Sequence, residues 1–111
     1  MNDADTQDAV LEALAHIWAD AYADAVERLT VIEYYCAAVR TGPANELQRG
    51  DAAAAAHKLA GTLGTFGFPT GSDYARSIDG ELSGPSPDEV AVHAVVQQTQ
   101  ALHALLDAAK P

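Results

Sequence analysis

AAAAAHKLAGTLGTFGF, residues 52–68, has a spacing that predicts an amphipathic helix centred on His57. At about 100° per residue, an apolar stripe falls on the side of the helix opposite His57. The residues of this stripe are Ala52, Ala56, Leu59, Leu63 and Phe66. Within roughly 60° of His57 there are only Gly and Ala residues, a set that we call the small-residue strip. It consists of Gly50, Ala53, Ala54, Gly61 and Gly64. His57 is therefore predicted to point into solvent.

The glycines of this helix favour a role in binding. A mid-helix glycine costs about 1 kcal/mol relative to alanine, so stability alone would favour Ala, Glu or Lys at positions 61 and 64. Glycines that lower helix stability without improving the packing mark a candidate functional surface. We expect a partner protein to dock close to the helix backbone here. The residues expected to form the docking surface are Ala53, Ala54, Gly61, Gly64 and Gly67.

Length and composition predict one all-α domain over residues 1–111. Alanine is abundant, and the β-branched and aromatic runs typical of strands are missing. Six basic and sixteen acidic residues give a formal net charge of −10. That charge disfavours nucleic acid and anionic membrane surfaces as partners.

The compartment expected from the sequence is the cytoplasm. The single cysteine, Cys36, cannot form an internal disulfide, and it is expected to be a small buried apolar residue. The acidic N-terminus has no signal-peptide pattern, and no apolar stretch approaches the ~20 residues of a membrane span.

Four helices are expected, packed as an up-down antiparallel four-helix bundle. A seam runs from Leu11 to Val39, and two successive four-residue steps near Trp18 favour a short or bent N-terminal helix with the bend at residues 18–21. Asn45 is expected to cap the helix of His57. Thr70 or Ser72 is expected to begin a third helix. The sequence Ser-Pro-Asp-Glu at residues 86–89 is typical of a capping box that begins a fourth.

The chemistry open to His57 is nucleophilic. An exposed imidazole is largely neutral at cytosolic pH, so one ring nitrogen carries a free lone pair. Transfer of an already activated phosphoryl group requires mainly positioning, and a histidine on a convex helix suits that step if the partner supplies the metal and the pocket. Lys58 could offset phosphate charge at the rim. We expect no metal site in this chain, because His93 and His103 point about 80° apart on their helix.

The histidine and the glycines four, seven and ten residues after it resemble the signature of histidine phosphotransfer (HPt) domains. These residues are His57, Gly61, Gly64 and Gly67, with Phe66 and Phe68 around the last glycine. The resemblance covers nearly the whole chain and implies a four-helix bundle. It implies that His57 accepts a phosphoryl group from an aspartate of a receiver domain and passes it to another receiver.

The resemblance also implies the partners and the cofactor. The expected partners are receiver domains of hybrid histidine kinases and of response regulators, and Mg²⁺ is expected on the receiver, with no cofactor in this chain. Many members of the family have lysine three residues after the histidine, where this chain has Ala60. Lys58 could take over the electrostatic role of that lysine. HPt domains of this size are often monomers, which is the state expected here.

The sequence is also compatible with two other functions. The chain could be a non-phosphorylated adaptor that binds receiver or kinase domains through the small-residue strip, or a structural bundle that dimerises through it. We expect a phosphoryl carrier and not a stand-alone kinase, because the sequence has no nucleotide-binding glycine loop. Whether the chain counts as an enzyme is left open.

Overall fold

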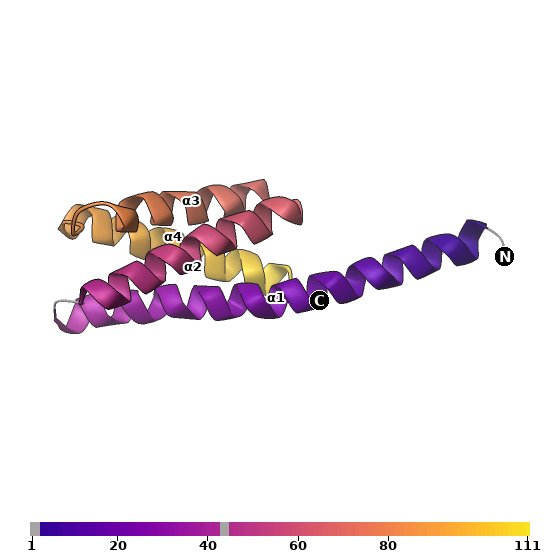
Figure 1. The fold of residues 1–111 in the computed structure, drawn as a ribbon, viewed down its shortest axis with the longest axis horizontal. Helices are drawn as coiled ribbons and strands as arrows, with labels where there is room; N and C mark the ends of the chain where they lie inside the picture. The colour runs from indigo at the N-terminus through magenta and orange to yellow at the C-terminus, as the bar shows by residue number, and fades with distance from the viewer. Residues whose placement is uncertain (1–2, 43–44) are drawn as a thin grey trace.

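The computed structural model describes residues 3–42 and 45–111, which form four helices and, within those ranges, no strand. The helices are α1 (Asp3–Thr41), α2 (Glu46–Thr65), α3 (Pro69–Ser83) and α4 (Glu89–Ala108). Helix α2 contacts α1 and α3, and α4 contacts α3 and α1, so neighbours in sequence pack side by side and α4 closes the square. The predicted antiparallel four-helix bundle is confirmed (Figure 1).

The core lies where the apolar seams of the four helices meet. The seam residues that are buried in it are Ala25, Leu29, Ile32, Cys36, Ala52, Ala56, Leu59, Leu63, Ala75, Ile78, Leu82, Val95, Leu102 and Leu106. Thr99 lies on the seam of α4 and is buried, and its hydroxyl donates to the carbonyl of Val95 at 2.7 Å. Phe66 is only partly buried. The helical period therefore identified the inward face of each helix within the bundle.

The N-terminal helix differs from the prediction. Helix α1 runs unbroken for 39 residues through the expected bend at residues 18–21. It contains no Gly or Pro that would break it. The two four-residue steps only rotate the seam around a continuous helix.

The first part of the predicted seam is not in the core. Helix α1 is about twice as long as α2 or α4, at 39 against 20 residues, so its N-terminal part projects beyond the bundle (Figure 1). Leu11 and Leu14 are exposed as a result. Trp18 marks where the bundle begins. Its ring centroid lies 5.2 Å from that of Phe66 and 5.1 Å from that of Phe68, and its Nε1 donates to the carbonyl of Ala109 at 3.0 Å.

The helix boundaries near the other turns are set by local hydrogen bonds. Asn45 caps α2 as predicted, and Gln48 completes a capping box with it. Helix α3 begins at Pro69, slightly before the expected start. The N-cap of α4 is Asp88, which accepts from the backbone N–H of Ala91 at 2.8 Å, so the expected start at residue 86 is wrong by about half a turn.

Cys36 is buried as expected, with its Sγ 3.8 Å from the Oγ1 of Thr99. Burial raises the pKa of this thiol, which keeps it protonated and unreactive. Within residues 3–42 and 45–111, no helix is both long and apolar enough to cross a bilayer.

Candidate functional site

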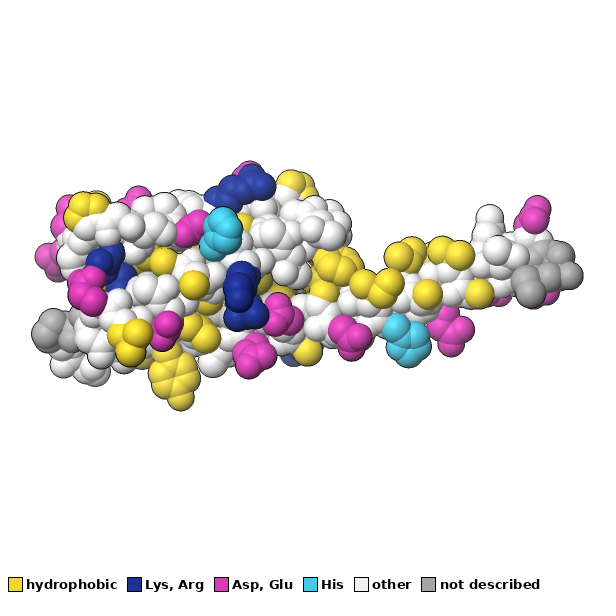
Figure 2. Space-filling view, in the orientation of Figure 1, with side chains coloured by type: hydrophobic (Ala, Val, Ile, Leu, Met, Phe, Trp, Pro, Cys, Tyr) yellow, Lys and Arg dark blue, Asp and Glu magenta, His cyan; other side chains and the backbone are white. Residues whose placement is uncertain are grey.

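His57 lies on the outer surface of α2, with 79% of its side chain exposed. The predicted outward direction is therefore confirmed. Leu59 and Leu63, predicted on the opposite side of the same helix, are fully buried. Figure 2 shows one imidazole on the face formed by α2 and α3, with a basic side chain on each side of it.

The imidazole is held by a carboxylate from the neighbouring helix. Nδ1 of His57 lies 3.0 Å from Oδ2 of Asp79 in α3, whose side chain is 26% exposed. The other carboxylate oxygen of Asp79 accepts a hydrogen bond of 2.7 Å from the hydroxyl of Ser83, one turn further along α3. Ser83 thus orients Asp79, and Asp79 orients His57.

This arrangement determines which ring nitrogen is free to react. A carboxylate can only accept a hydrogen bond, so Nδ1 of His57 is the donor and carries the proton. In the neutral imidazole the lone pair is then on Nε2, the nitrogen away from Asp79. A positive charge that develops on the ring when Nε2 forms a bond is stabilised by the adjacent carboxylate. The arrangement therefore gives an exposed and oriented imidazole that is able to act as a nucleophile through Nε2.

The small-residue strip is exposed on one side of His57 and buried on the other. Gly50, Ala54 and Gly61 are exposed, and a Cβ added at Gly50 or Gly61 would meet no atom within 4 Å. Ala53 is buried instead, with an exposed fraction of 9%. The expectation that Ala53 belongs to the docking surface is corrected here. Helix α2 packs between α1 and α3, which leaves it a narrow outer sector.

The two other glycines of the motif have different surroundings. Gly64 is exposed, and a Cβ added there would lie 3.4 Å from Oγ of Ser72. Gly67 has φ of +83°, a conformation that favours glycine. The N–H groups of Gly67 and Phe68 donate back to the carbonyls of Gly64 and Leu63, a Schellman motif that ends α2. The turn therefore explains Gly67, whereas no contact within the described part of the chain explains Gly61.

Ala60 faces α3 and not the solvent. It is buried, and its carbonyl accepts a hydrogen bond of 2.8 Å from the buried hydroxyl of Ser72 in α3. The α2–α3 contact is closely packed next to this hydrogen bond. A Cβ added at Gly71, the residue before Ser72, would lie 3.0 Å from methyl carbons of Leu63 and Leu105. A lysine at position 60 would have to emerge through the α2–α3 contact. This packing gives a physical reason for alanine there.

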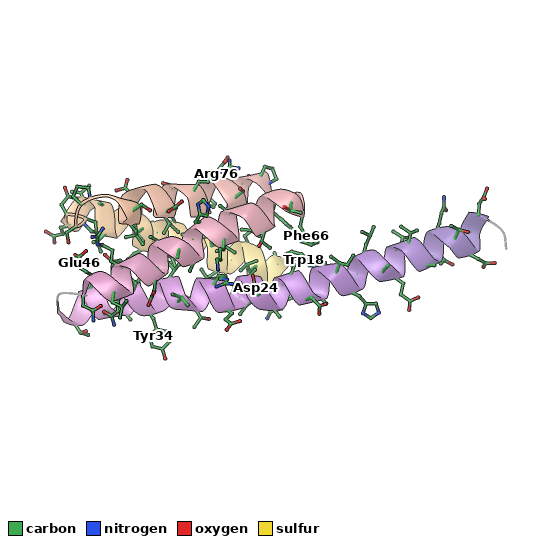
Figure 3. All side chains as sticks on the ribbon, viewed as in Figure 1. Trp18, Asp24, Tyr34, Glu46, Phe66 and Arg76 are labelled. Carbon is green, nitrogen blue, oxygen red and sulfur yellow. The ribbon has the colours of Figure 1, made fainter. Side chains whose placement is uncertain are left out.

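Basic side chains of α2 and α3 lie on the two sides of the site. Lys58 is exposed and borders a shallow groove between α1 and α2, together with Arg28, Val31 and Asp51. It therefore lies on the side of α2 away from Asp79. The only basic residue of α3 is Arg76, three residues before Asp79, and it is exposed beside Asp73 at 3.5 Å (Figure 3). Anionic groups arriving at His57 would meet a positive charge from either side.

Sequence reasoning missed Asp79, Ser83 and Arg76. The four-residue spacing of Asp79 and Ser83 places them on one face of a helix, and Asp79 follows the core residue Ile78, so both could be placed at the edge of α3. Their proximity to His57 depends on how α3 packs against α2. The period of a single helix does not contain that information.

The remaining histidines do not form a second site of this kind. His103 lies 3.3 Å from a carboxylate oxygen of Glu33 and 3.3 Å from one of Asp107, so both of its ring nitrogens are engaged. Over residues 3–42 and 45–111, no group of three His, Cys, Asp or Glu side chains is arranged to hold a metal ion. No protein-family model, curated protein or solved structure matches the chain significantly. Fold and site together define a helical bundle with an exposed histidine, His57, whose Nδ1 is held by a carboxylate while Nε2 has no hydrogen-bond partner among the described residues.

Proposed function

We propose that this protein is a phosphoryl carrier of a phosphorelay, with His57 as the phosphoacceptor. The observation that carries the proposal is the 3.0 Å contact between Nδ1 of His57 and Asp79, which directs the lone pair of Nε2 outward. The resemblance to HPt domains supports the same function. On this proposal the donor and the acceptor are receiver domains of hybrid histidine kinases and of response regulators, and the protein acts in the cytoplasm.

The transfer follows from the geometry of the histidine. Nε2 of His57 attacks the phosphorus of an aspartyl phosphate on the receiver. The N–P bond forms as the bond between phosphorus and the carboxylate oxygen breaks, and the receiver aspartate leaves as a carboxylate. The ring keeps its proton on Nδ1 and becomes a phosphorylated imidazolium, whose positive charge Asp79 offsets. Attack by an aspartate of a second receiver reverses these bond changes and restores the neutral imidazole.

Helices α2 and α3 would contribute positive charge, and the receiver domain would contribute the metal ion. Lys58 and Arg76 are exposed cations at the two sides of the site, where they can attract the three phosphoryl oxygens without contacting the ring. Mg²⁺ is expected on the receiver domain, which holds the aspartate that is phosphorylated. The exposed backbone at Gly61 leaves room for the receiver to approach α2 closely.

The direct test is transfer from a phosphorylated receiver domain. The purified chain is mixed with each phosphorylated receiver of the same organism, and acid-labile, alkali-stable phosphate on the chain is measured over time. We expect at least one receiver to transfer within seconds to minutes. If none of them transfers phosphate to the wild-type chain, the proposal is wrong.

Replacing Asp79 by Asn is expected to slow phosphoryl transfer to and from His57 by roughly tenfold to a hundredfold. The same range is typical when a metal-binding histidine loses the carboxylate that orients it. An amide cannot offset the charge of the phosphorylated ring, and it no longer selects the tautomer with the lone pair on Nε2. Transfer rates in both directions are measured with one receiver. Asp107→Asn is the matched control, because it removes a carboxylate beside His103. Equal rates for the Asp79 variant and the wild type would contradict this role.

Replacing Gly61 by Leu is expected to weaken receiver binding by tenfold or more while leaving the bundle folded, since a side chain there meets open space. The measurement is the dissociation constant of the complex. Gln97→Leu is the control, because it adds the same side chain to an exposed position of α4, a helix that neighbours α1 and α3 rather than α2. Binding that is lost in Gly61→Leu and kept in His57→Ala, with no transfer to the wild type, would favour the adaptor function instead.

A further inference from the structure

The N-terminal part of α1, residues 3–17, carries an apolar stripe that no other residue of the described ranges 3–42 and 45–111 covers. The side chains of Val10, Leu11, Leu14 and Ile17 are 52–63% exposed, although all four are large and apolar. They recur at steps of one, three and three residues. At about 100° per residue they therefore lie within roughly 60° of the direction of Leu14. We call these four residues the overhang stripe.

The overhang stripe continues the side of α1 that the bundle buries. By the same count of about 100° per residue, Ala25, Ile32 and Cys36 point within roughly 40° of the direction of Leu14, and all three are buried against the other helices. Helices α2 and α4 end near Trp18, so this side of α1 has no partner before that point. Figure 2 shows apolar side chains along one edge of the projecting helix and acidic side chains with an imidazole along the other.

The charge of the overhang decides which partner fits it. Residues 3–17 contain four acidic residues and no Lys or Arg. Ala13 and Ala15, about 100° from Leu14 on either side, leave space for long aliphatic stems to lie beside the stripe and reach Asp8, about 120° from Leu14. The same stretch of a second copy would bring no Lys or Arg to this contact. Lysine and arginine side chains of a different protein would pair with Asp8.

We propose that the overhang stripe is a docking surface for an amphipathic helix of another protein, apolar along one stripe and bordered by Lys and Arg. That helix would lie against α1 where α2 and α4 have ended, so that the stripe of α1 stays covered beyond the bundle. This surface is at one end of the molecule and is separate from His57, so the proposal does not depend on phosphoryl transfer.

The test uses a defined probe, a 21-residue peptide of three heptads with Leu at the a and d positions and Lys elsewhere. A scrambled peptide of the same composition is its control. Binding is followed by the fluorescence of Trp18, the single tryptophan, which lies where the overhang meets the bundle. We expect the amphipathic peptide to bind at least about tenfold more tightly than the scrambled one, because only the former presents a continuous apolar stripe. Equal binding of the two peptides would overturn the proposal.

Two variants separate apolar docking from simple charge attraction. Leu11→Asp/Leu14→Asp removes apolar surface and adds negative charge. If the peptide docks through the stripe, its affinity for this variant falls by about tenfold or more. If the peptide is held by charge attraction alone, its affinity rises. Leu47→Asp/Val90→Asp adds the same two charges at exposed positions of the opposite end of the bundle and is expected to leave the affinity unchanged or slightly higher. Leu11→Gln/Leu14→Gln repeats the test with good helix formers.

The outcomes have distinct meanings. Weaker binding of the amphipathic peptide to both Leu11/Leu14 variants, with unchanged helical circular dichroism, supports the proposal. Unchanged or tighter binding to them overturns it. Sedimentation of the wild-type chain alone tests the other occupant, a second copy. A dimer that forms at micromolar concentration and dissociates in Leu11→Gln/Leu14→Gln would show that the stripe serves self-association, which also overturns the proposal.

Discussion

A chain carrying His57→Gln is expected to take up no phosphoryl group from a receiver that phosphorylates the wild type. Glutamine has no nucleophilic ring nitrogen, so no N–P bond can form at position 57. The substitution preserves the fold, because His57 is mostly exposed and the hydrogen bond that it makes within the described ranges, to Asp79, can also be made by an amide. The measurement is acid-labile phosphate bound to the chain after mixing with the phosphorylated receiver.

The matched control is His103→Gln, which removes the other histidine that contacts carboxylates. It is expected to accept phosphate at the wild-type rate, since both ring nitrogens of His103 are already engaged by Glu33 and Asp107. Uptake that persists in His57→Gln and disappears in His103→Gln would place the acceptor on the α1–α4 side of the bundle. Such a result would sink the assignment of His57.

Leu63→Ala is expected to lower the free energy of unfolding by about 3–5 kcal/mol, the cost of removing a buried leucine and leaving a cavity. Leu63 is fully buried, and one of its methyl groups lies 3.0 Å from where Gly71 would carry a Cβ. Its carbonyl also accepts the hydrogen bond that closes the turn after α2. The surrounding helices cannot collapse into the space without shifting that turn.

Urea unfolding followed by circular dichroism measures this loss. Leu47→Ala on the same helix is the control. Its side chain is largely exposed, so we expect a change of no more than about 0.5 kcal/mol. A loss below about 1 kcal/mol for Leu63→Ala would mean that the α2–α3 contact is looser than the packing at Gly71 indicates.

Much of the fold followed from local patterns in the sequence. The helical period placed Leu59 and Leu63 inward and His57 outward, because the direction of a side chain on a straight helix depends only on its position along the chain. Asn45 was identified as a cap because its side chain satisfies a backbone N–H three residues away. These features involve interactions within one helix or one turn, and they need no knowledge of the neighbouring helices.

Features that depend on the packing of two helices could not be predicted from local sequence patterns. The sequence pattern favoured a bend in α1, whereas the structure has one continuous helix. The bundle covers only the second part of this helix, which leaves Leu14 exposed. Ala53 lies near His57 on the helix and is nevertheless buried, because α3 packs on that side.

The four helices within the bundle, their inward faces and the outward direction of His57 could be predicted from the sequence, because each follows from the period and the end signals of a single helix. The contact of Asp79 with Nδ1 of His57 and the orientation of Ala60 toward α3 became known from the packing of the helices. The same holds for the projection of the first part of α1 with its apolar stripe uncovered. Every contact between two packed helices depends on their register and separation, and neither quantity is encoded in the period of one helix.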